Sequence, residues 1–278
     1  MNRLMLRRVK VPSVTWQLMV ALTLTFVLGS LPVKAQEGKE AAPKIEEKAM
    51  TLVKRMATVL SQAKQFTFTA DIAFDAVQDS GQKIEFGETR KIVVRRPDRI
   101  RIDVTKRDGS LSGFVFDGKD IAVFNVQDKV YATVAKPGTV DEAIDYFTQS
   151  LDMRMPLGEL LASDLPQLLQ ERLHEADYVE QATIGGVLCD HVALRGERAH
   201  VQLWIARGDQ PLPRRMVITY TRAEGQPQFS AQFSDWNLSP EVSDTLFAFT
   251  PPAGAVKIAF APRQPGGGEA SDQQGEAQ

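Results

Sequence analysis

The chain has 278 residues, with 33 basic and 35 acidic side chains, a net charge of −2 and a single cysteine. Nucleic acid and anionic membrane surfaces attract strongly basic proteins, so this balance argues against both as partners. One cysteine excludes an internal disulfide, so stability must come from a hydrophobic core, for which the chain is long enough.

The first 35 residues have the order of a secretory signal peptide. They contain five basic residues and no acidic one, and an apolar run over residues 16–28 follows the basic start. Small residues at Val33 and Ala35 stand where a signal peptidase reads the chain. We predict cleavage before Gln36 and a periplasmic mature protein with 28 basic and 35 acidic residues, a net charge of −7.

This segment has three other interpretations. A permanent anchor needs about 20 apolar residues, which this segment reaches only if several threonines and Ser30 are counted. Lipoprotein processing needs a cysteine at the cleavage point, but the only cysteine is Cys189. The pair Arg7 and Arg8 invites a twin-arginine signal, yet nothing later suggests a cofactor loaded before export. We expect that the protein is not an integral membrane protein after the signal peptide has been cleaved.

Residues 43–63 predict an amphipathic helix near the start of the mature domain. Pro43 suits a first helical turn, and the apolar residues that follow recur at spacings of three and four. They are Ile45, Ala49, Leu52, Val53, Met56, Val59, Leu60 and Ala63. We expect this single apolar stripe to pack on a sheet.

Alternating apolar and polar residues then predict a run of strands. The pattern is clear in residues 66–76, where Phe66, Phe68 and Ile72 alternate with threonines and aspartates. Further strands are expected at residues 84–94, 100–105, 114–116, 121–126 and 130–134. Asp108-Gly109 and Asp117-Gly118 are typical hairpin dipeptides, and strands joined so tightly are antiparallel.

Residues 139–173 interrupt the strands with helical signals. Thr139 and Glu142 have capping-box spacing, and Ser163 or Asp164 caps a second piece with Pro166 in its first turn. The segment is richer in apolar residues than a sheet-covering helix needs, and methionines repack around varied ligands. It predicts a lid over a ligand hollow, with ordinary packing on the sheet as the alternative. The lid residues are Ile144, Phe147, Leu151, Met153 and Met155.

Strand signals resume after the helices and complete the predicted fold. We expect strands at residues 178–184, 187–194, 200–206, 214–221 and 228–236, with a last one at residues 246–249. Residues 262–278 lack large apolar side chains and predict a disordered tail. Residues 36–261 therefore predict one α+β domain, a large curled antiparallel sheet or incomplete β-barrel of about ten strands, with helices on its concave face.

Catalytic and metal-binding signatures are missing from the sequence. It has no nucleophile elbow, no glycine-rich phosphate loop and no zinc-protease helix. Cys189, Asp190 and His191 form the one tempting cluster, but on a strand Asp190 points away from the other two. We predict no catalytic residue, no metal site, no cofactor and no enzymatic activity.

Several short motifs, in their order, resemble a known family. They are RRPDRIR at residues 95–101, FDGK at 116–119, GGVLCDH at 185–191, QLWI at 202–205, FSDW at 233–236 and FAFTPP at 247–252. This pattern resembles a family of uncharacterised predicted periplasmic proteins related to the lipoprotein carrier LolA, over nearly all of residues 43–258. The resemblance implies an incomplete β-barrel with helices over its concave face. It also implies that the protein carries acyl chains, or that it senses lipids or misfolded envelope proteins. It implies no catalytic residue.

A curled sheet that is too wide to be filled by its own side chains leaves an apolar hollow. The candidates to line it, for each of which plain core packing is the alternative, are Phe66, Phe68, Phe86, Phe114, Phe116, Phe124, Trp204, Met216 and Ile218. The first hypothesis is a non-enzymatic carrier or sensor that binds acyl chains or an acylated lipoprotein in this hollow. The second is a module that recognises another envelope protein through its sheet edges and through Arg95, Arg96, Arg99 and Arg101. An atypical hydrolase is the third.

Overall fold

The computed structural model describes residues 45–150 and 155–260. The expected signal peptide at residues 1–35, the expected tail at residues 262–278 and the lid residues Leu151 and Met153 lie outside the described residues. The described residues belong to one compact unit.

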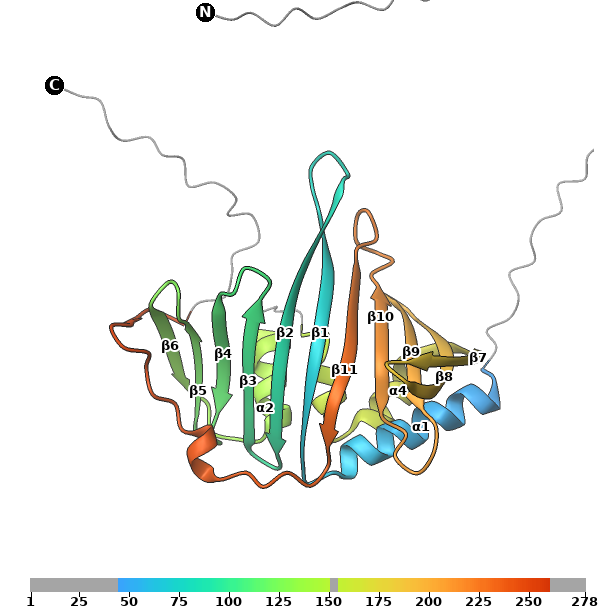
Figure 1. Ribbon diagram of the computed structural model, residues 1–278, viewed down its shortest axis with the longest axis horizontal. Coiled ribbons are helices and arrows are strands. Elements are labelled where there is room, and N and C mark those ends of the chain that lie inside the picture. The colour runs from blue at the N-terminus through green and yellow to red at the C-terminus, as the bar shows by residue number, and fades with distance from the viewer. Residues whose placement is uncertain (1–44, 151–154, 261–278) are drawn as a thin grey trace, which may run out of the picture. The chain divides into compact units, whose positions relative to one another are not determined.

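A single twelve-stranded sheet dominates this unit (Figure 1). The strands are β1 (Gln65–Val77), β2 (Lys83–Arg95), β3 (Arg99–Lys106), β4 (Leu111–Phe116), β5 (Asp120–Asn125), β6 (Val130–Ala135), β7 (Leu173–Ile184), β8 (Val187–Gly196), β9 (His200–Ala206), β10 (Pro213–Thr219), β11 (Gln228–Asn237) and β12 (Val256–Lys257). Their order across the sheet is β12-β6-β5-β4-β3-β2-β1-β11-β10-β9-β8-β7. Neighbours are antiparallel except β12 and β6, which are parallel. Because β7 and β12 stand at opposite ends of this order, the sheet is not closed.

The strand pattern follows from the alternation in the sequence. In β1, Phe66, Phe68, Ala70 and Ile72 are buried on one face while the residues between them are partly or fully exposed. The register continues this face across the sheet, since Phe68 pairs with Ile92. The hairpin dipeptides also turn the chain as expected.

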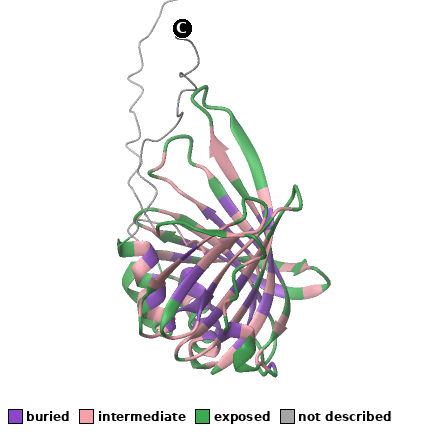
Figure 2. Cartoon of the chain, turned by 90° about the vertical axis from the view of Figure 1, so that its left-hand side faces the viewer, coloured by how far each residue is buried: buried purple, intermediate pink, exposed green. Residues whose placement is uncertain are grey.

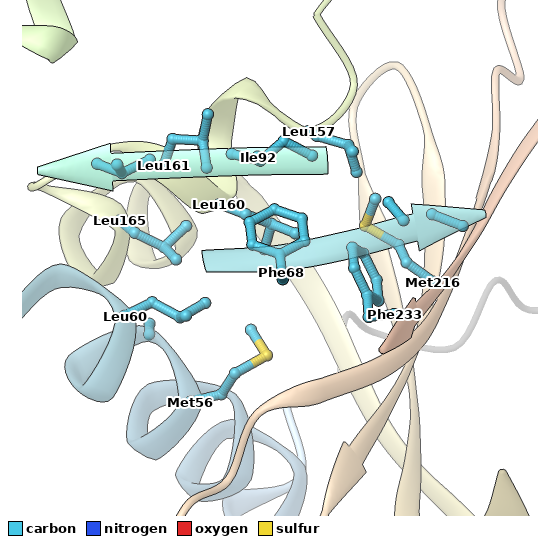
Figure 3. Packing of buried hydrophobic residues seen from close by; sticks show 14 of the residues in the cluster. Met56, Leu60, Phe68, Ile92, Leu157, Leu160, Leu161, Leu165, Met216 and Phe233 are labelled. Carbon is cyan, nitrogen blue, oxygen red and sulfur yellow. The ribbon is translucent and has the colours of Figure 1, made fainter. Parts of the chain in front are cut away.

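Helices cover one face of the sheet, which is called the inner face below. They are α1 (Glu47–Gln62), α2 (Val140–Asp145), the π-helical turn η1 (Tyr146–Ser150), α3 (Gly158–Leu161) and α4 (Leu165–Arg172). Figure 3 shows Met56 and Leu60 of α1 directed towards Leu165 and Phe68, inside one hydrophobic core. The expected α+β fold, with a curled and mostly antiparallel sheet and helices on its concave face, is confirmed. Its strand count exceeds the expected ten.

The capping box predicted for α2 is present. The hydroxyl oxygen of Thr139 accepts a hydrogen bond from the backbone N–H of Glu142, and the Glu142 carboxylate accepts one from the Thr139 N–H. Both bonds satisfy N–H groups that the first turn of a helix leaves unpaired.

The segment that follows β11 runs past the lower ends of the central strands towards β6 (Figure 1), and its aromatic residues pack on side chains of the outer face. Phe247 is buried under the guanidinium of Arg95, whose partner is Asp244. Phe249 packs on Phe124 and Tyr131, with ring centroids 5.8 and 5.6 Å away. The strand predicted at residues 246–249 is therefore wrong, because this stretch contains the end of the 3-10 helix η2 (Asp244–Phe247) and is held by side-chain packing.

Candidate functional site

Two adjoining cavities lie between the helices and the inner face of β8, β9 and β10. Their volumes are about 860 and 610 Å³, within the range of about 300–1,000 Å³ that is usual for small-molecule sites. They share lining residues, among them Ala199, Val201 and Ile218. The two cavities are therefore neighbouring parts of one hollow.

The floor of the hollow is apolar strand surface. Val201 of β9 pairs with Ile218 of β10, and Leu203 pairs with Met216. Because side chains alternate along a strand, these four share the inner face while Val217 points outward. The roof of the smaller cavity consists of leucines from the helices, namely Leu160, Leu165, Leu168 and Leu169.

The rim of the hollow is charged. Arg172 pairs with Glu159, and Arg222 pairs with Glu197 at 2.8 Å. Both pairs are more than half exposed, and exposed pairs add little to stability. Arg198 lines both cavities and has no ion-pair partner among the residues that the structure describes. An apolar floor beneath a polar rim suits a ligand with one apolar and one polar end.

The structure separates the predicted lining residues into distinct environments. Met216 and Ile218 line the cavities. Four of the predicted aromatic residues, all on the inner face of the central strands, are packed under the helices, where their own contacts fill the space. They are Phe66, Phe68, Phe114 and Phe116. Phe86 pairs with Phe74 on the projecting end of the β1–β2 hairpin and is 49% exposed.

The prediction that Phe124 and Trp204 line the hollow is wrong. Phe124 lies on the outer face, where Phe249 stacks on it. Trp204 also lies on that face, stacked on His191 with ring centroids 4.0 Å apart and approached by Arg215. Size and aromaticity suggested an interior position, but the outer face has aromatic packing of its own.

The predicted lid residues that the structure describes lie in two settings. Ile144 and Met155 line the larger cavity, together with Thr148 and Gln149. Phe147 is buried and contacts Phe114 edge to face at 5.1 Å, as expected of a packing residue.

Sequence reasoning missed part of the site. Ala199, Val201 and Leu168 line both cavities. Val201 and Leu203 alternate with the polar Gln202 along β9, and this alternation was the available signal. No sequence pattern indicated that Ala199 and Arg172 line the cavities, because their positions depend on how α4 packs against the loop between β8 and β9.

The cluster around Cys189 is not arranged for catalysis. His191 Nε2 lies 3.1 Å from Gln202 Oε1, and burial lowers the pKa of its imidazole. Burial also raises the pKa of the Cys189 thiol, which disfavours a nucleophilic thiolate. Asp190 faces the inner side, where it accepts a hydrogen bond from the Tyr178 hydroxyl at 3.2 Å. In the described ranges, no group of three or more potential ligands could hold a metal ion.

The arginines of the RRPDRIR motif are engaged within the protein. Arg101 donates to both carboxylate oxygens of Asp103, at 2.8 Å each. Arg95 pairs with Asp244 and Arg99 with Asp98. Arg96 turns to the helical layer, where its Nη2 donates to the Leu161 carbonyl at 2.7 Å. These contacts leave little of the motif available to a partner.

Comparisons with known proteins agree with the sequence patterns. A family model described as "Predicted periplasmic protein (DUF2092)" matches residues 49–261. The comparison with curated proteins gave no match. Within residues 45–150 and 155–260, no helix is long and apolar enough to cross a membrane.

Solved structures similar to this chain include three bacterial proteins. A LolA superfamily protein from Nitrosomonas europaea is 13% identical, covers 72% of this chain and 97% of its own, and has a TM-score of 0.38. The lipoprotein LppX of Mycobacterium tuberculosis is 14% identical, with coverages of 70% and 98% and a TM-score of 0.45. LprF from Mycobacterium bovis is 12% identical, with coverages of 77% and 100% and a TM-score of 0.46. At such values, function has to be argued from the residues of this chain.

Proposed function

Since the chain belongs to the DUF2092 family of predicted periplasmic proteins, we propose that it is a non-enzymatic periplasmic protein that binds acyl chains of a lipid or of an acylated protein. The site is the hollow between α3, α4 and strands β8 to β10. The ligand's polar end faces the charged rim, and its chain lies on the apolar floor.

One observation carries this proposal: the hollow is large and its floor consists of inner-face aliphatic side chains. Val201, Leu203, Met216 and Ile218 offer hydrocarbon surface without a fixed hydrogen-bonding pattern. Such a surface binds by removing apolar area from water, at about 25 cal/mol for each Å². It therefore suits a chain of methylene groups better than a polar metabolite.

The absence of an arranged catalytic group in the described residues supports binding over hydrolysis. The nearest candidates, Cys189 and His191, lie on the outer face, away from the hollow. No nucleophile, base and third orienting group meet there in the way that covalent catalysis requires.

The test is saturable binding of palmitate by delipidated protein, measured by titration calorimetry. Ala199 is small and lines both cavities, so Ala199→Trp should fill the hollow and abolish uptake. Ala135→Trp is the matched control, because Ala135 is exposed at the end of β6 and lines neither cavity. No saturable uptake by the unaltered protein, or equal uptake by both variants, would contradict the proposal.

A second candidate function rests on the free edge of β7. The chain before α1 covers the start of this edge, where Glu46 N–H donates to the Ala176 carbonyl at 2.8 Å. Beyond Tyr178, no strand in the described part of the chain pairs with the free edge of β7. An extended segment of another envelope protein would add there as a further strand. A photocrosslinker at Val179 should then capture one stable partner. If a photocrosslinker at Ala199 captures a partner and the one at Val179 does not, the result favours the acyl-binding function.

A further inference from the structure

The floor of the hollow continues across the sheet as one row of apolar residues. Cross-strand pairing joins Val201 to Ile218, Ile218 to Phe229, Phe229 to Phe74, and Phe74 to Phe86. All five side chains occupy the same row on the inner face, since directly paired residues point to the same side. The row thus runs from β9 to β2 without a polar residue.

Exposure changes along this row from the hollow to the hairpin. Ile218 and Phe229 are buried, whereas Phe74 is 36% exposed and Phe86 is 49% exposed. The β1–β2 hairpin rises beyond the neighbouring strands (Figure 1), and its upper part is coloured exposed and intermediate (Figure 2). Ile84, two positions before Phe86 on the same face, is also exposed.

A hairpin-stabilising role does not account for this position. The rings of Phe74 and Phe86 stack with centroids 6.1 Å apart, and such a pair stabilises a hairpin on either face of a sheet. Here the pair lies on the face and in the row that lead into the hollow. Exposed apolar patches of this kind mark interaction sites.

We propose that Phe74 and Phe86, at the exposed end of this row, are an extension of the hollow that binds the distal part of a long acyl chain. This inference rests on the proposed function. Three inter-strand spacings of about 4.8 Å separate Ile218 from Phe86, so a chain must reach about 14 Å beyond Ile218 to contact Phe86. The protein would therefore discriminate ligands by chain length, and Phe86 would act only on long chains.

The experiment compares octanoate with palmitate, each titrated below its micelle concentration into the full protein by calorimetry. The variant is Phe74→Ser with Phe86→Ser, and its control is Leu111→Ser. Leu111 is 44% exposed, between Phe74 at 36% and Phe86 at 49%, but its pairing with Thr105 places it on the outer face. Thermal melting of each variant checks that the exposed substitutions leave the fold intact.

The double variant should weaken palmitate binding about tenfold, as loss of two apolar contacts predicts, and leave octanoate binding unchanged. The single variant Phe86→Gln should show a smaller effect in the same direction, and Leu111→Ser none. Unchanged palmitate binding, or an equal loss for both ligands, would overturn the extension while leaving the proposed function in place. If the unaltered protein binds neither ligand, both the extension and the proposed function fail.

Discussion

His191 couples the stability of the outer face to pH. Its ring is buried against Trp204 and bonded to Gln202, and burial lowers the pKa of the imidazole below its usual 6.5, opposed by Gln202 and Glu180. The folded protein thus favours the neutral ring. The stability this gives is complete above pH 6.5 and is lost as the pH falls through the lowered pKa.

We expect the urea midpoint of the unaltered protein to fall between about pH 7 and pH 5 more steeply than that of His191→Gln. His200→Gln is the control, since His200 is exposed. The urea midpoint of this variant should keep the full pH dependence of the unaltered protein. Parallel pH profiles for the unaltered protein and His191→Gln would show that carboxylates alone set the dependence.

Arg96 ties the end of β2 to the helical layer. Its side chain is 13% exposed and lies 4.0 Å from Asp141, and burial lowers the pKa of its guanidinium, with Asp141 opposing. Arg96→Ala removes the donor to the Leu161 carbonyl and should lower the free energy of unfolding by ~1–3 kcal/mol. Arg99→Ala, which loses a more exposed pair with Asp98, should cost less in the same urea titration. Equal losses would show that Arg96 gives no special support to the helices.

The residues predicted for the hollow show what alternation alone can determine. It assigned Met216 and Ile218 to one face of their strand, and the structure places both beside the cavities. It could not identify the outer face of β5, because Phe124 is covered there by Phe249 from a segment far away in sequence. Trp204 was misplaced for the same reason, since its stacking partner His191 lies on the preceding strand.

At the scale of elements, the helical layer between β6 and β7 is the part most open to change. α3 has four residues and α2 has six, and short helices depend on tertiary packing for their stability. Both contribute residues to the larger cavity.

We therefore expect amide hydrogens in residues 140–150 and 155–172 to exchange faster than those of β1 and β11. Saturation with palmitate should slow their exchange, because a ligand under these helices restrains them. The exchange of β3, which has no residue at the cavities, serves as the internal control. Equally high protection with and without palmitate would contradict the predicted lid and leave an ordinary helical layer.

Element prediction succeeded where local signals were complete. The capping box at Thr139 and Glu142 located the start of α2, because both hydrogen bonds involve residues close in sequence. The apolar run at residues 246–249 predicts a strand, but its conformation is set by distant contacts with Arg95, Phe124 and Tyr131. No local pattern could have revealed those partners.

At the scale of the whole described unit, the segment after β11 packs on the outer face of the sheet and stabilises it. Phe247 is 1% exposed, so Phe247→Ala should cost ~3 kcal/mol or more in urea unfolding. Phe249→Ala is the matched control and should cost less, because Phe249 is half-buried. A cost for Phe247→Ala below that of Phe249→Ala would contradict the anchoring role. The ordered motifs had already indicated the family, which the match over residues 49–261 confirms.

The order of strands also has a kinetic consequence. Strands β1 to β6 follow one another in the sheet, as do β7 to β11, and the two halves meet only where β1 pairs with β11. When the chain folds from its N-terminus onward, strands β1 to β6 form first. The edge of β1 then still has no partner. Joining residues as distant as Phe74 and Phe229 requires closure of a very long loop, which makes this step slow. Until β11 pairs with β1, the folding protein has an unpaired sheet edge, and its yield depends on how well that edge is kept from other chains.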